Sequence, residues 1–184
     1  MSKIKEKILL NRIKAGDKEA FSELYDLYLE RIYRFIYFKV SGVQEAEDLS
    51  SEVFLRVWQY IKDDTEIENI GAFLYRVSRN VVIDFYRKSY GKETVSLEDH
   101  DIIDNLRADN LIEKIDSNAQ IKGVMEKLDN LKEEYREIIL LRYVEEYTLS
   151  EIADIMNRSK GATRVLAHRA LEALKKETGE DVGI

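Results

Sequence analysis

The feature that most constrains the fold of this chain is the complete absence of proline from its 184 residues, which also contain only eight glycines. Proline breaks the interior of a helix and glycine weakens it, so their scarcity leaves long helices uninterrupted. Apolar residues recur at spacings of three and four along most of the chain, as they do on one face of an α-helix. The sequence therefore predicts an all-α protein.

Helical periodicity and cap residues divide the chain into successive helices. We expect helices over residues 4–15, 18–40, 43–61, 70–89, 109–128 and 132–146. Asp17 and Asn69 are the predicted N-caps of the second and fourth of these, because their side chains accept hydrogen bonds from free backbone N–H groups. In the last of them, Ile138, Leu141 and Val144 should share one face.

A helix-turn-helix pattern occupies residues 148–177. Thr148 is followed three residues later by Glu151, which is the spacing of a capping box, and Ser159 can cap a second helix. The apolar face expected on that second helix consists of Ala162, Val165, Leu166, Ala170, Leu171 and Leu174. The helix is basic and could lie in the major groove of DNA. Two short helices with basic residues near the C-terminus are also common in ordinary helical bundles.

The chain as a whole is acidic, with a formal net charge of −7. An acidic surface opposes phosphate binding, so DNA binding requires the basic residues to be segregated. Residues 71–92 hold five basic residues against one acidic, whereas residues 93–116 hold two against eight. We therefore predict two small helical domains, residues 1–90 and 109–184, joined by an acidic linker at 91–108.

Two polar surfaces in the first domain have both a functional and an ordinary interpretation. On the third helix, Asp48, Glu52 and Arg56 form a polar stripe, which is either an interface or a solvated face. On the fourth helix, basic residues alternate with aromatic ones, as in a single-strand binding site. An amphipathic helix whose arginines reach out to water would give the same pattern. The residues of this second surface are Arg76, Arg79, Asn80, Tyr86, Arg87 and Lys88.

Composition argues against several other classes of protein. There is no cysteine and there are two histidines, so neither disulfides nor a zinc site of the usual kind is expected. We find no nucleophile and base arrangement and no phosphate-binding glycine loop, and we expect no enzyme, cofactor, metal or small-molecule substrate. No run approaches the ~18 apolar residues of a membrane span, and the charged N-terminus is unlike a signal peptide, so we expect a cytoplasmic protein.

Four segments in order resemble the sigma factors of bacterial RNA polymerase, of the small extracytoplasmic-function (ECF) type. They are AGDKEAFSELYDLYLERIYRFIY at residues 15–37, AEDLSSEVFLRVW at 46–58, AFLYRVSRNVVIDFYRK at 72–88, and LKEEYREIILLRYVEEYTLSEIADIM followed by RSKGATRVLAHRALEALKK from 131 to 176. A lone helix-turn-helix is a weak signal, but four segments spaced for a two-domain protein are a strong one.

The resemblance implies a transcription-initiation factor that acts with core RNA polymerase on promoter DNA. In this family the first domain binds the polymerase clamp helices, and Asp48, Glu52 and Arg56 lie in the matching segment. The segment that matches residues 72–88 captures the non-template strand of the minus-10 element, and the base-reading loop before it matches residues 62–69. An anti-sigma protein is often a further partner.

The resemblance also implies that the second domain reads the minus-35 element through the major groove. The residues implied in this contact are Ser159, Lys160, Thr163, Arg164, His168 and Arg169. Relatives usually carry a small polar residue and a further basic one right after the position of Arg164, where this chain has Val165 and Leu166. That departure, with the acidic net charge, leaves open an alternative: a helical polymerase-interacting protein that does not open promoters.

Overall fold

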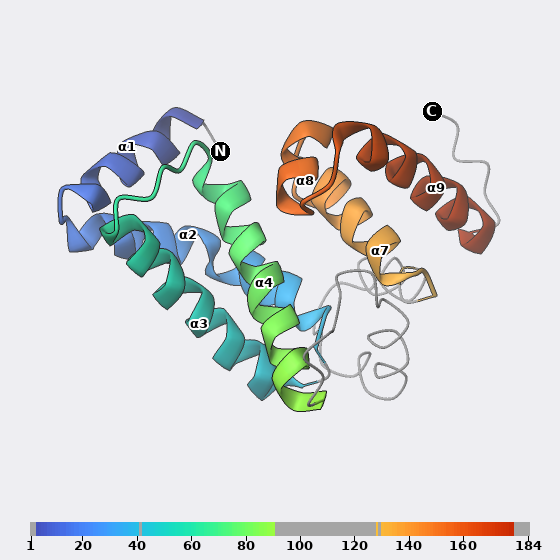
Figure 1. Ribbon diagram of the computed structural model, residues 1–184, viewed down its shortest axis with the longest axis horizontal. Coiled ribbons are helices and arrows are strands. Elements are labelled where there is room, and N and C mark those ends of the chain that lie inside the picture. The colour runs from blue at the N-terminus through green and yellow to red at the C-terminus, as the bar shows by residue number, and fades with distance from the viewer. Residues whose placement is uncertain (1–2, 41, 91–127, 129, 179–184) are drawn as a thin grey trace. The chain divides into compact units, whose positions relative to one another are not determined.

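The computed structural model describes residues 3–40, 42–90, 128 and 130–178. Every regular element in these ranges is a helix, and no strand occurs in them (Figure 1). The chain divides into two compact units, Met1–Ser96 and Leu97–Ile184. The expected all-α class is confirmed. The predicted linker at 91–108 and the helix expected at 109–128 lie outside the described residues, apart from Leu128.

The described residues of the first unit form four helices that all contact one another. They are α1 (Lys3–Lys14), α2 (Lys18–Tyr37), α3 (Val43–Lys62) and α4 (Ile70–Tyr90). Long apolar side chains from α2, α3 and α4 fill the space between them, among them Leu24, Tyr28, Ile32, Ile36, Val53, Val57, Leu74 and Val81. Burial of this apolar surface is the main favourable contribution to the stability of the unit.

Local hydrogen bonds start the helices where the sequence predicts. Asp17 Oδ1 accepts from the Ala20 N–H at 3.1 Å, and Asn69 Oδ1 accepts from the Ala72 N–H at 3.0 Å. Both predicted N-caps are confirmed. In the loop between α3 and α4, Asp64 adopts φ 54°, and its carboxylate lies 2.9 Å from Lys14 Nζ of α1. This ion pair ties the loop before α4 to the first helix.

The first helix that the structure describes in the second unit changes its type midway. The expected single helix at 132–146 is instead α7 (Glu133–Ile139) followed by η1 (Leu140–Val144), a π-helix. The Glu145 N–H donates to the Leu140 carbonyl at 3.0 Å, five residues back. This wider turn shifts the helical phase, so Val144 is 47% exposed. The expectation that Val144 shares a buried face with Ile138 and Leu141 was therefore wrong.

The helix-turn-helix consists of α8 (Leu149–Ile155) and α9 (Lys160–Thr178). Thr148 and Glu151 form the expected capping box at the start of α8. Ser159 Oγ accepts from the Ala162 N–H at 3.2 Å and caps α9 as predicted. In the turn between them, Arg158 Nη2 lies 2.8 Å from Glu134 Oε2 of α7. This contact fastens the turn to the preceding helix.

The buried side of α9 differs from the expected apolar face. Thr163, Leu166 and Ala170 are buried, whereas Ala162 and Val165 are exposed. Among the described residues, α7 and α8 pack against α9, and the three buried residues Thr163, Leu166 and Ala170 recur at spacings of three and four along it. The apolar pattern had suggested a wider buried surface than the short partner helices can cover.

Candidate nucleic-acid and protein interfaces

The polar stripe of α3 combines one exposed residue with two that are held in place. Asp48 is exposed, and Glu52 and Arg56 are half-buried. Arg56 Nε donates to Glu52 Oε1 at 3.0 Å, one turn earlier on the same helix. Arg56 Nη1 also donates to Asp84 Oδ2 of α4 at 3.0 Å. Burial would lower the pKa of Arg56, but the hydrogen bonds to Asp84 and Glu52 offset it, and the net pKa is raised. The guanidinium stays charged.

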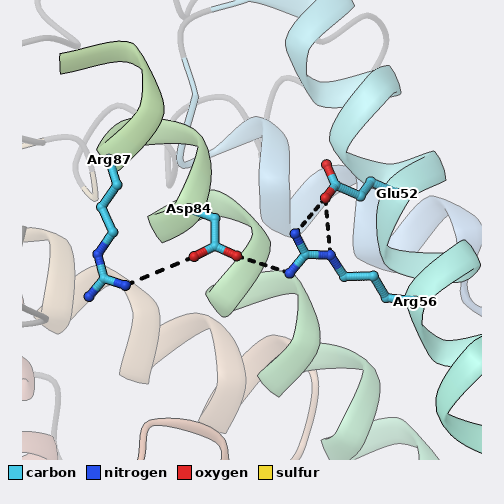
Figure 2. A network of polar contacts seen from close by, with 4 residues as sticks. All are labelled: Glu52, Arg56, Asp84 and Arg87. Atoms are coloured by element: carbon cyan, nitrogen blue, oxygen red, sulfur yellow. Dashed lines mark hydrogen bonds and ion pairs between the residues drawn. The ribbon is translucent and has the colours of Figure 1, made fainter. Parts of the chain in front are cut away.

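Asp84 extends this contact into a chain of four charged residues. Its other carboxylate oxygen lies 3.9 Å from Arg87 Nη1, one turn further along α4. Figure 2 shows the resulting order Glu52, Arg56, Asp84 and Arg87, which runs from α3 to α4. Sequence reasoning missed Asp84, because its partner is 28 residues away and no local pattern joins them.

A second residue that sequence reasoning missed is Leu55. Its side chain is 65% exposed. It lies two helical turns after Asp48 and therefore on the same side of α3. The signal was present in the sequence, because Leu55 is out of phase with the buried stripe through Val53 and Val57. An exposed leucine beside carboxylates suits a protein partner better than a nucleic acid.

The exposed side of α4 carries most of the residues predicted for single-strand binding. Arg76, Asn80, Arg87 and Lys88 are exposed, and the first three share one face. The Arg76 guanidinium lies 5.1 Å from the centre of the Phe73 ring, which meets the Tyr60 ring edge-on at 5.5 Å. Tyr60 is 43% exposed. The Arg76 guanidinium of α4 and the accessible Tyr60 ring at the end of α3 thus both contact the buried Phe73 ring.

Arg79 and Tyr86 were expected beside that face, as part of the same single-strand surface, but the structure places both in the core. Arg79 is 6% exposed and Tyr86 is 4% exposed. The Tyr86 hydroxyl donates to the Lys39 carbonyl at 2.5 Å. A buried ring offers no face on which a base could stack. The physical reason is that α4 packs against α2 as well as α3, so a wide arc of the helix is buried.

The residues predicted for duplex binding are mostly exposed on α9. Ser159, Lys160, Arg164, His168 and Arg169 are accessible. Thr163 is not on this side: it is fully buried, and its Oγ1 donates to the Ser159 carbonyl at 3.0 Å. A threonine hydroxyl in a helix commonly donates its hydrogen bond to the carbonyl four residues earlier. The expectation that Thr163 lies on or near the exposed side of α9 is therefore corrected. Val165 and Leu166 are the two residues that differ from the usual pattern of relatives. Leu166 is buried, so only Val165 lies on the outer face.

Other kinds of site are not found in the part of the chain that the structure describes. Among the described residues there is no group of three histidine, cysteine or acidic side chains that could hold a metal ion. The helices within the same ranges include none that is long and apolar enough to cross a membrane.

The second helical unit contains a basic helix-turn-helix, the arrangement with which one class of transcription proteins binds DNA. The model of sigma-70 region 2 matches residues 24–91, and that of sigma-70 region 4 matches residues 128–176. The chain belongs to the ECF RNA polymerase sigma factors of the sigma-70 family. It is a transcription-initiation factor that directs RNA polymerase to promoters, and it is not an enzyme.

Relatives match along most of the chain. The ECF sigma factor SigM of Bacillus subtilis is 31% identical over 154 residues, which cover 83% of this chain and 91% of SigM. SigW of the same organism is 29% identical over 178 residues, covering 91% and 94%. BldN of Streptomyces coelicolor is 32% identical, and the match spans 66% of its length.

A solved structure shares the fold. The sigma factor RpoE of Bartonella quintana, crystallised with the anti-sigma factor NepR, superposes with a TM-score of 0.68. It is 22% identical, and the match covers 88% of this chain and 98% of that one.

Proposed function

We propose that the two units divide promoter recognition between them. The first unit binds core RNA polymerase and captures the non-template strand of the minus-10 element, and the second reads the minus-35 element as duplex. The observation that carries this proposal is the set of exposed basic side chains on α4 and on α9 in a chain of net charge −7; they are Arg76, Arg87, Lys88, Lys160, Arg164 and Arg169. Local cationic surfaces favour phosphate contacts that the whole chain would otherwise oppose.

The polymerase interface in this proposal is the outer face of α3. Asp48 is accessible for an ion pair with a basic partner, and Leu55 supplies exposed apolar area beside it. Glu52 and Arg56 are already paired, so they would present a fixed arrangement of charge rather than loose side chains. A preordered side chain loses less entropy on binding than a mobile one.

The minus-10 surface consists of the exposed face of α4 and the loop that precedes it. Arg76, Arg87 and Lys88 would neutralise phosphates, and Asn80 can hydrogen-bond a base edge or the backbone. Bases unstack at this step at a cost of a few kcal/mol, which contacts with the protein must offset. Arg79 and Tyr86 would act from within, by holding α4 in place.

The minus-35 surface is the exposed side of α9. Arg164 is the strongest candidate for a base contact, because arginine can donate two hydrogen bonds to guanine. Ser159 and Lys160 at the start of the helix, and His168 and Arg169 further along, would contact phosphates or flanking bases. Thr163 would support the turn that positions them.

We also propose an anti-sigma protein as a partner and the cytoplasm as the location. The first rests on the RpoE structure, which was determined with such a protein bound. The second rests on the partners, since core polymerase and promoter DNA are both cytoplasmic in bacteria.

The experiment is run-off transcription by core RNA polymerase on a library of promoter fragments, with and without this chain, beside a pull-down of the polymerase. Selective transcripts that require the chain are the expected result, and they would yield its promoter. Polymerase binding without transcripts at any promoter would favour the alternative of an interaction protein. Failure to bind polymerase would overturn the proposal.

A further inference from the structure

An exposed branched apolar side chain lies in the middle of the outer face of α9. Val165 is 51% exposed. It lies on the side opposite to the buried residues Thr163 and Ala170. A single exposed valine on a protein surface needs no explanation by itself. This one matters because of what surrounds it.

Cationic side chains border Val165 on both sides. Arg164 precedes it, Arg169 lies one turn further along the helix, and both are exposed. Side chains of this kind bring a helix against DNA phosphates and hold it in the groove. Val165 also lies in the first two turns of α9, and the N-terminal part of a recognition helix is the part that contacts base edges.

Gly161, one turn before Val165 on the same face, is unusual in a helix. A Cβ placed there would meet nothing within 4 Å, and its φ is not in the left-handed range. Packing within the described residues therefore does not require glycine, although glycine weakens a helix relative to alanine. A missing side chain at this point lets another surface come closer to the helix backbone than any other residue would.

We propose that Val165 reads the 5-methyl group of a thymine in the minus-35 element, with Gly161 allowing the close approach. Among the base edges of the major groove, the methyl group of thymine is the apolar feature, and apolar side chains recognise it by contact. Valine offers two methyl groups and no hydrogen-bonding atom. The inference rests on the proposed reading of the minus-35 duplex by α9, and it names one base that α9 distinguishes.

The test removes the methyl group from the DNA and leaves everything else in place. A duplex is selected by the holoenzyme, formed from core polymerase and the full chain, out of a library randomised across the promoter. Each thymine of its minus-35 region is then replaced singly by deoxyuridine, and holoenzyme affinity is measured. We expect one or two positions at which loss of the methyl group weakens binding about fourfold, equivalent to ~0.8 kcal/mol for one buried carbon.

The same substitutions are measured with Val165→Ser. This variant should bind the thymine and uracil duplexes equally at those positions, because the apolar contact is gone. The matched control is Val144→Ser, the same change at another exposed valine of the second unit, outside α9. It should keep the wild-type ratio. If Val165→Ser keeps the ratio as well, or if no thymine shows a methyl effect, the proposal is overturned.

Gly161→Ala gives an independent check with two readouts. Its thermal midpoint should stay the same or rise, because alanine favours the helix. Its affinity for the selected duplex should nevertheless fall severalfold, because the added methyl group holds the helix away from the bases. A variant that gains stability and keeps full affinity would remove Gly161 from the proposal.

The outcomes separate this inference from the function on which it rests. If the holoenzyme selects no sequence from the library, the proposed minus-35 reading fails and this inference fails with it. If a sequence is selected but its thymine methyl groups are irrelevant, promoter reading stands and only the role of Val165 is overturned.

Discussion

Arg56 of α3 and Asp84 of α4 form an ion pair across the two helices, with Nη1 3.0 Å from Oδ2 (Figure 2). The pair joins the surface proposed for polymerase to the helix proposed for the minus-10 strand. Asp84 also faces Arg87, one of the exposed basic residues of that helix. The Asp84 carboxylate thus pairs with one arginine on each side. Removing its charge should affect the positions of both arginine side chains.

Asp84→Asn tests whether this pair couples the helices. We expect the free energy of unfolding to fall by about 0.5–1 kcal/mol, because the two side chains are only partly buried and exposed pairs contribute little. Urea denaturation of Asp84→Asn, Arg56→Ala and the double variant gives the coupling energy. Losses that simply add would show that the two groups do not interact.

A control for this measurement is present on α2. Glu30 pairs with Arg34 at 3.9 Å, and the Glu30 side chain is 90% exposed. Glu30→Gln should therefore change stability less than Asp84→Asn.

Asp48→Ala tests the polymerase surface. Asp48 is exposed, so its loss should leave the unfolding transition unchanged while affinity for core polymerase falls. Removal of a rim charge typically lowers the association rate and its dependence on salt. Binding kinetics at two salt concentrations would measure both.

The matched control for Asp48→Ala is Glu47→Ala, an exposed acidic neighbour that points to a different side of α3. Equal losses in the two variants would indicate a general charge effect. Full affinity in Asp48→Ala would mean that the stripe is only a solvated face.

The fold class and the helix starts could be predicted because they depend on local sequence. The N-caps Asp17, Asn69 and Ser159 each act within three residues of themselves, and so does the capping box at Thr148. Spacing alone reveals such contacts. The exposed basic residues on α9 were also predictable, because charged side chains are seldom fully buried.

The buried arc of each helix could not be predicted, because it depends on how many partners pack against it. Tyr86 and Arg79 of α4 are buried because three helices, α1, α2 and α3, pack against α4. Val165 of α9 is exposed because it lies on the side of the helix opposite to the buried Thr163 and Ala170. The π-helix at residues 140–144 shifts the phase of Val144, and the partner of Arg56 is far away in sequence. None of these has a local signal.

Tyr86→Phe separates a structural role from a role in DNA binding. It removes the hydroxyl that donates to the Lys39 carbonyl. We expect a loss of about 1 kcal/mol in the free energy of unfolding, as for one buried hydrogen bond. The affinity of the holoenzyme for promoter DNA, measured well below the unfolding transition, should not change. Weaker DNA binding with unchanged stability would instead place Tyr86 on the DNA surface.

Arg164→Ala and Arg158→Ala distinguish two arginines that lie six residues apart. Arg164 is exposed, so its loss should weaken duplex binding by about 1–3 kcal/mol if it reads a base, with stability unchanged. Arg158 is paired with Glu134, so its loss should lower stability first. Duplex affinity and urea denaturation of both variants are the measurements. Unchanged affinity in Arg164→Ala would remove it from the set of base readers.

Asp17→Asn tests how the first unit responds to acid. The hydrogen bond from the Ala20 N–H, and then the one from Arg12, lowers the pKa of Asp17 below its ordinary value of 3.8. A lowered pKa adds stability above the unfolded value, and that stability is lost as pH falls through the folded one. Asparagine caps a helix about as well but does not titrate. The free energy of unfolding, followed from about pH 6 to about pH 2, should therefore fall less steeply at its acid end in Asp17→Asn than in the wild type.

Asp26→Asn, at an exposed aspartate of α2, controls for the loss of one negative charge. Parallel acid limbs for the wild type and Asp17→Asn would show that this cap does not contribute to acid unfolding.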